Sequence, residues 1–129
     1  MRKLLPILLS ALVFTGCASS NIQTNTYRQI SMDEAIAMMA EETGYIILDV
    51  RRADEFAEGH IPGAINVANE SIGTDEIPEL PDKNQLIMVY CRSGRRSKEA
   101  AEKLVKLGYT NIVEFGGILD WKGETVTGQ

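Results

Sequence analysis

Two short, nearly continuous apolar runs constrain the fold of this chain more than any other feature of its sequence. Residues 45–50 (Tyr-Ile-Ile-Leu-Asp-Val) and 86–90 (Leu-Ile-Met-Val-Tyr) consist mainly of residues that favour β-strands. Runs that lack polar alternation are typical of strands buried on both faces of a parallel sheet. The sequence therefore predicts two central strands of such a sheet.

Two segments with helical periodicity alternate with these strands. The first opens at residues 31–34 (Ser-Met-Asp-Glu), which have the form of a capping box, and its helical spacing continues until Gly44. The second begins at Ser97 and is closed by Gly108, and a brief last strand is expected at residues 112–114. Alternating strands and helices predict an α/β fold, with a central parallel sheet flanked by α-helices on both faces.

The first residues follow a different pattern, which predicts a secretion signal. Arg2 and Lys3 precede an apolar run of eleven residues, too short to span a bilayer, for which a helix needs about 20 residues. Residues 14–17 (Phe-Thr-Gly-Cys) resemble the lipobox of bacterial lipoproteins, where cleavage precedes a Cys that is then lipidated. Ordinary cleavage after Ala18 or Ser19 is the alternative.

The chain length of 129 residues suits one compact domain behind this signal. We expect a lipoprotein-type signal peptide at residues 1–16, a lipidated Cys17, a flexible tether at residues 17–27 and a single domain at residues 28–125. Either cleavage exports the domain. The predicted location is a membrane-anchored lipoprotein that faces the periplasm or the cell exterior.

The charge of the chain argues against nucleic-acid binding, and the position of its arginines indicates one candidate site. The formal net charge is −5 at pH 7, whereas nucleic-acid backbones are bound by clustered Lys and Arg, so no nucleic-acid partner is expected. Against this acidic background, Arg92, Arg95 and Arg96 form the one concentrated positive cluster, directly after Cys91.

Cys91 is the candidate nucleophile. If Cys17 is lipidated, Cys91 is the only thiol left, and an unpaired Cys in an exported protein is more often reactive than structural. It follows a predicted strand, where ligands of parallel sheets collect, and Gly94 permits a tight loop into a helix. Backbone N–H groups and the dipole at a helix N-terminus favour a thiolate, so we expect Cys91 to be ionised.

Several motifs, in this order, resemble those of the rhodanese domain. They are residues 49–51 (Asp-Val-Arg), residues 55–56 (Glu-Phe), residues 59–67 (Gly-His-Ile-Pro-Gly-Ala-Ile-Asn-Val), residues 91–97 and Gly116, Gly117 and Trp121. The resemblance covers about residues 28–122 and is nearest to small, periplasmic, single-domain members. It implies a rhodanese-like α/β fold and a six-residue loop from Cys91 to Arg96 that cradles a persulfide.

The resemblance also implies a sulfurtransferase with two half-reactions. The Cys91 thiolate would take the outer sulfur of an anionic donor such as thiosulfate and pass it from a persulfide to cyanide or a thiol. The residues expected to bind substrate are Arg92, Ser93, Gly94, Arg95, Arg96 and Ser97. Asp49 and Arg51 are expected to form a hydrogen-bonded pair or to bond to the Cys91 loop. No cofactor or metal is expected.

Three further residues carry separate expectations. His60 lies in a turn signature of the family, and Trp121 follows Gly116 and Gly117, so both are expected to be structural. Glu55 stands where two-domain relatives that use thiosulfate carry a basic residue. That difference argues against thiosulfate as the physiological donor.

Two other functions fit part of the pattern. Cys-dependent phosphatases and arsenate reductases use a Cys-x5-Arg loop, usually preceded by His, whereas Arg96 completes Cys-x4-Arg and Tyr90 precedes the Cys. This loop is one residue shorter. A persulfide carrier without turnover, or a rhodanese-like binding module that docks to a partner protein, is the non-enzymatic alternative that the sequence leaves open.

Overall fold

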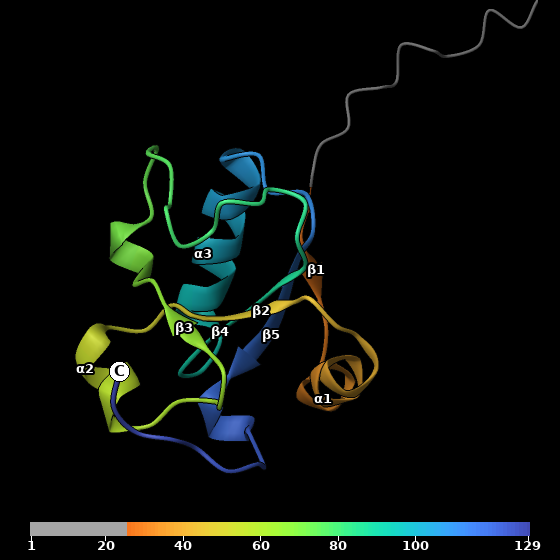
Figure 1. The fold of residues 1–129 in the computed structure, drawn as a ribbon, viewed down its shortest axis with the longest axis vertical. Helices are drawn as coiled ribbons and strands as arrows, with labels where there is room; N and C mark the ends of the chain where they lie inside the picture. Colours follow the sequence, from red (N-terminus) through yellow and green to blue (C-terminus); the bar gives the residue numbers. More distant parts are fainter. Residues whose placement is uncertain (1–25) are drawn as a thin grey trace, which may run out of the picture.

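Residues 26–129, which the computed structural model describes, form a five-stranded parallel sheet (Figure 1). The strands are β1 (Arg28–Gln29), β2 (Ile46–Asp49), β3 (Ile65–Asn66), β4 (Ile87–Cys91) and β5 (Ile112–Gly117). Their order across the sheet is β1-β5-β4-β2-β3, and every neighbouring pair is parallel. The predicted parallel α/β class is confirmed.

The expected signal peptide, Cys17 and nearly all of the expected tether lie outside the described residues, and the domain boundaries predicted from sequence stay predictions. Within the described residues, no helix combines the length and the apolar character needed to cross a membrane.

Three α-helices accompany the strands of the described residues, namely α1 (Met32–Glu41), α2 (Ala53–Glu58) and α3 (Arg95–Lys106). The capping box expected at the start of α1 is present. The Ser31 hydroxyl accepts a hydrogen bond from the Glu34 N–H at 3.1 Å, and the Glu34 carboxylate accepts one from the Ser31 N–H at 3.2 Å. These two bonds satisfy N–H groups that a helix start otherwise leaves unpaired.

The core has two parts, one on each face of the sheet. Leu104 and its neighbours on α3 pack against alternate residues of β4, whereas Met32 of α1 and Phe56 of α2 pack on the other face. Figure 1 shows α3 and α1 on opposite sides of the strands. Every residue of β4 is buried, as expected for a strand covered on both faces.

Several boundaries differ from those predicted. β4 extends to Cys91, α3 begins two residues before Ser97, and β5 continues to Gly117. Three elements are not predicted from the sequence, namely β1, β3 and α2. β1 and β3 have two residues each, so they carry no measurable periodicity and exist because a neighbouring strand offers them hydrogen bonds.

Candidate active site

Cys91 ends β4 at the carboxyl edge of the sheet, and its side chain is fully buried. The chain then turns through Gly94, whose φ of +113° is in the left-handed region that favours glycine. Gly94 is also the N-cap residue of α3, and its N–H donates a hydrogen bond to Cys91 Sγ at 3.0 Å. The nucleophile candidate therefore lies at the N-terminus of a twelve-residue helix, where an anion is favoured.

The end of β5 and the residues after it contact the backbone of this loop. A Cβ atom added to Gly117 would overlap the carbonyl oxygen of Arg92, so only glycine allows this close approach. The N–H of Leu119 donates to the same carbonyl oxygen at 3.3 Å. Gly117 therefore packs directly against the backbone of the Cys91 loop.

Ser97 lies beneath the loop rather than on its open side. Its side chain is buried, and Cys91 Sγ lies 3.4 Å from Ser97 Oγ, the acceptor of the thiol hydrogen bond. Ser97 was predicted to bind substrate. In this structure it contacts the sulfur of Cys91 and the backbone of Gly94.

The loop arginines surround one hollow of about 590 Å³. It is lined by Arg52, Glu55, Glu70, Arg92, Ser93, Arg95 and Arg96. The structure therefore brings Arg92, Ser93, Arg95 and Arg96 together, as the sequence led us to expect. It adds Arg52, Glu55 and Glu70, which the substrate-binding set did not include.

An acidic residue already neutralises Arg96. Its guanidinium donates to the two carboxylate oxygens of Glu55 at 2.6 and 3.1 Å, and both side chains are mostly buried. The hydrogen bond from Arg96 holds the pKa of Glu55 below its usual range, and the same bond raises the pKa of Arg96. Glu55 thus occupies the donors that an anionic substrate would seek on Arg96.

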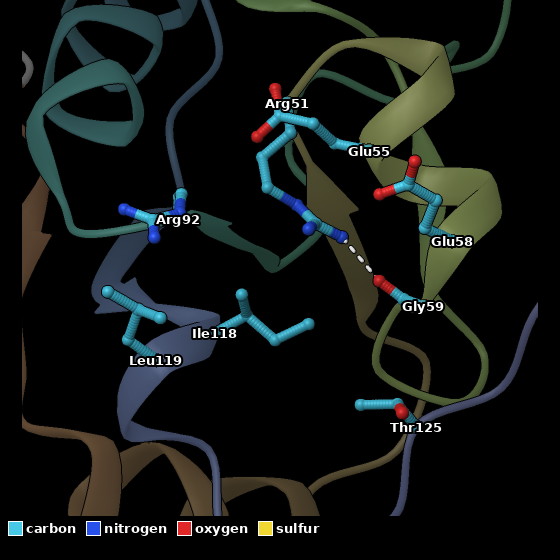
Figure 2. A pocket seen from close by; sticks show the side chains of 8 residues that line it. All are labelled: Arg51, Glu55, Glu58, Gly59, Arg92, Ile118, Leu119 and Thr125. Atoms are coloured by element: carbon cyan, nitrogen blue, oxygen red, sulfur yellow. Dashed lines mark hydrogen bonds between the residues drawn. The ribbon is translucent and has the colours of Figure 1, made fainter.

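The other two loop arginines differ from Arg96. Arg95 is exposed and pairs with Glu99 at 3.3 Å within α3, while Arg92 makes no ion pair among residues 26–129. Arg92 also lines a second hollow of about 400 Å³, shown in Figure 2, where Leu119 lies beside it and Arg51 reaches toward Gly59. Arg92 therefore supplies the uncompensated positive charge of the loop.

Asp49 and Arg51 form the hydrogen-bonded pair that was one of the two expected arrangements. Arg51 Nη2 lies 2.7 Å from Asp49 Oδ2 and donates a second bond, also of 2.7 Å, to the carbonyl oxygen of Gly59. Tyr90 lies beside them, and its pKa is raised, first by burial and then by Asp49. The pair thus braces the segment after α2 instead of bonding to the Cys91 loop.

His60 and Trp121 have contacts that fit a structural role. The His60 ring is buried, stacks on Phe56 with a centroid distance of 3.6 Å, and its Nδ1 lies 2.8 Å from the Phe56 carbonyl oxygen. The indole N–H of Trp121 donates to the Glu124 carbonyl oxygen at 3.0 Å. Within residues 26–129, no cluster of three or more His, Cys, Asp and Glu side chains is placed to bind a metal ion.

Glu114 is the residue near the site that sequence reasoning missed. It lies on β5, is buried, and its carboxylate accepts hydrogen bonds from Ser97 and from the Gly116 N–H. The sequence feature that could have identified Glu114 is an acidic residue inside an apolar strand, directly before Phe115.

The site as a whole combines a buried thiol, a helix N-terminus and a cationic rim. Together these features suit covalent attack on a soft anionic electrophile.

The sequence profile of the Rhodanese-like domain matches residues 31–124. The chain belongs to the rhodanese-like family. This rhodanese domain is 37% identical over 73 residues to Thiosulfate sulfurtransferase PspE from Escherichia coli (strain K12), covering 57% of this chain and 70% of that protein. It is 33% identical over 107 residues to Thiosulfate sulfurtransferase GlpE from Pseudomonas entomophila (strain L48), covering 79% and 94%.

The solved structures that resemble this chain belong to the same family. A rhodanese with anions from E. coli is 34% identical, has a TM-score of 0.59, and is matched over 65% of this chain and 99% of that one. The human single-domain sulfurtransferase TSTD1 is 25% identical with a TM-score of 0.60, over 69% and 88%. The rhodanese-like α/β fold is therefore established, and the chain is homologous to sulfurtransferases.

Proposed function

We propose that this rhodanese-like protein is a sulfurtransferase that carries a sulfane sulfur as a persulfide on Cys91. The observation that carries the proposal is the placement of Cys91 Sγ at the start of α3, with the Gly94 N–H 3.0 Å away, in a loop whose arginines line one hollow. Oriented N–H groups and nearby cations favour both a thiolate and an anionic persulfide. The names of the two bacterial relatives point to thiosulfate as a donor to test.

The reaction has two half-reactions that share one enzyme intermediate. In the first, the Cys91 thiolate attacks the outer sulfur of thiosulfate, a new S–S bond forms, and the donor S–S bond breaks so that sulfite leaves with its electron pair. In the second, cyanide or a thiolate attacks the outer sulfur of the persulfide, and the Cys91 thiolate is released. This sequence is ping-pong covalent catalysis and requires no oxidant or reductant.

Arg92 is the residue best placed to attract the donor. Its charge is uncompensated within residues 26–129, and it lines both hollows beside the loop. Arg96, in contrast, must share its guanidinium with Glu55. We infer that an anionic donor binds first near Arg92 and competes with Glu55 for Arg96.

A mass measurement tests the proposal directly. Incubation with thiosulfate should add one sulfur, about 32 Da, to the peptide that contains Cys91, and cyanide should remove it. Cys91→Ser should show neither step, because a serine hydroxyl is not ionised at neutral pH and cannot hold a transferable sulfur. Sulfurtransferase activity that survives Cys91→Ser would refute the proposal, whereas Cys17→Ala is the control expected to keep the adduct.

A persulfide carrier that docks to a partner protein is the second candidate function. The observation that favours it is Leu119, an apolar side chain that is 61% exposed on the rim of the hollow shared with Arg92 (Figure 2). A steady-state assay with thiosulfate and cyanide, compared with persulfide transfer to protein thiols, separates the two candidates. Negligible turnover with the small donor and rapid transfer between proteins would favour the carrier.

A further inference from the structure

Glu114 is a buried acidic residue without a cation. Its side chain is 2% exposed, and β5 holds it between β4 and β1, opposite Val89 and Gln29. Among residues 26–129, no Lys, Arg or His forms an ion pair with it. Since burying a carboxylate is costly unless its oxygens are hydrogen-bonded, the contacts of Glu114 call for a physical reason.

Those contacts lead to the nucleophile. Glu114 Oε2 lies 2.5 Å from Ser97 Oγ and 2.9 Å from the Gly116 nitrogen, while Ser97 Oγ lies 3.4 Å from Cys91 Sγ. Thiol, hydroxyl and carboxylate therefore form a continuous hydrogen-bonded line. All three side chains are buried.

The chemistry of the groups sets the direction of these bonds. A serine hydroxyl has one hydrogen, and an ionised carboxylate can only accept, so the hydroxyl hydrogen belongs to the bond with Glu114. The carbonyl oxygens of Gly94 and Gly116 also lie near Ser97 Oγ, at 2.9 and 3.4 Å, but the carboxylate is the closest and the only charged acceptor. The lone pairs of Ser97 then face the thiol hydrogen.

We propose that Glu114 accepts the proton of Cys91 through Ser97. In this step the S–H bond of Cys91 breaks and its proton moves to Ser97 Oγ, while the hydroxyl hydrogen of Ser97 moves to Glu114 Oε2. The products are a thiolate and a neutral carboxyl group, so one negative charge moves from Glu114 to Cys91. The inference rests on the proposed function, in which Cys91 reacts as a thiolate.

The transfer keeps every hydrogen bond of the line. Afterwards, the Glu114 hydroxyl donates to Ser97, and Ser97 donates to the Cys91 thiolate, which also keeps the bond from the Gly94 N–H. Loss of the thiol proton to water would instead place two negative charges in one buried cluster, which opposes ionisation. The line therefore ionises Cys91 without that repulsion.

Glu114, at the far end of the line, borders a different hollow from the one that the loop arginines line. Cys91 is fully buried, whereas Glu114 lines a separate hollow of about 400 Å³ with Gly94 and Gly116. The titratable groups that line this hollow beside Glu114 are Lys98 of α3 and Asp120. The pKa of Tyr27 is raised, first by burial and then by the negative charges of Glu102 and Glu114.

A simpler role for Glu114 predicts the opposite effect on Cys91. If the carboxylate only braces Ser97 and Gly116, its charge opposes the thiolate, and its removal should make Cys91 more reactive. If Glu114 accepts the proton, its removal should make Cys91 less reactive below neutral pH, because the thiol has lost its proton acceptor. The sign of the change separates the two roles.

The test measures alkylation of Cys91 by iodoacetamide in the full-length chain, read from the mass of the Cys91 peptide so that Cys17 does not interfere. At about pH 6, Glu114→Gln should react about tenfold more slowly than the wild type, because the thiol has lost the group that takes its proton. Glu102→Gln, which removes an exposed negative charge from α3, should react like the wild type. Equal or faster alkylation of Glu114→Gln would overturn the proposal.

Ser97 provides a second, independent pair of variants. Ser97→Ala breaks the line and should slow alkylation as Glu114→Gln does, whereas Ser97→Thr retains the hydroxyl and should restore most of the rate. Circular dichroism checks that each variant is folded, and the Ser97 pair decides the question if Glu114→Gln is not. If Ser97→Ala reacts as fast as Ser97→Thr, the relay is wrong.

Alkylation needs neither a sulfur donor nor an acceptor, so the two proposals fail separately. Slow alkylation of Glu114→Gln in a protein that never forms the sulfur adduct would refute the sulfurtransferase and retain the relay. Fast alkylation of Glu114→Gln in a protein that does form the adduct would refute the relay alone.

Discussion

At the level of single residues, the three loop arginines differ in their capacity to bind an anion, because they differ in their acidic partners. Glu55 binds Arg96 through both carboxylate oxygens, Glu99 pairs with the exposed Arg95, and Arg92 has no acidic partner within residues 26–129. The three arginines look equivalent in the sequence, but their capacity to bind an anion differs because two of them are already neutralised.

Replacing Glu55 by Gln should therefore strengthen binding of an anionic donor. The variant frees the Arg96 guanidinium and removes one negative charge from the hollow, so the KM for thiosulfate should fall about two- to fivefold, as expected for a partly buried ion pair. Glu41→Gln removes an exposed charge from α1, lines neither hollow beside the loop, and should leave the KM unchanged. A higher KM for Glu55→Gln would mean that Glu55 is needed to orient Arg96.

At the scale of secondary-structure elements, the site is a junction of β4, β5 and α3. β4 carries Cys91 to the sheet edge, and the N–H of Gly94, the N-cap of α3, donates to Cys91 Sγ. β5 passes close to the loop backbone at Gly117. Register between β4 and β5 shifts near Cys91, which pairs with Gly117. The loop keeps its shape because these elements converge on it.

Gly117→Ala should break this junction. The added Cβ would overlap the Arg92 carbonyl oxygen, so the loop backbone must move, at a cost of about 1–3 kcal/mol in the free energy of unfolding. Urea denaturation measures that loss, and formation of the Cys91 persulfide should fall with it. Gly73→Ala is the matched control, since a Cβ there meets no atom within 4 Å. An unchanged unfolding midpoint for Gly117→Ala would contradict the close approach.

At the scale of the whole molecule, we propose that the domain is attached to a membrane through a lipid on Cys17. Residues 14–17 motivate this proposal, and Cys17 lies outside the described residues. Acyl chains supply membrane affinity of about 0.8 kcal/mol for each buried CH₂ group, which an acidic domain lacks by itself.

Cys17→Ala should release the protein from membranes into the soluble fraction of its host. Fractionation and intact mass of the purified protein measure location and lipidation together. Cys91→Ser keeps the same signal and should stay with the membranes, which makes it the control. Wild-type protein that is soluble in a detergent-free extract would exclude the anchor.

Some of this architecture is predictable from sequence because local patterns encode it. The apolar runs of β2 and β4 report burial on both faces, and the capping box at Ser31 places the start of α1. Cys91, Gly94 and the arginines are close in the chain, so a strand followed by a tight turn and a helix brings them together in any parallel sheet. These features depend on residues only a few positions apart.

The pairings that join distant segments depend on strand order and register, which local patterns do not encode. Glu55 meets Arg96 across 41 positions because β2 and β4 are neighbours and α2 follows β2 at the same sheet edge. Glu114 reaches Ser97 because β5 lies next to β4 beneath α3. Periodicity reports whether a residue is buried, but strand order and register determine which side chain it meets. For this reason the sequence by itself was enough to find the loop and its candidate nucleophile, Cys91. The fold was needed to show that Glu55 contacts Arg96 and that Glu114 contacts Ser97.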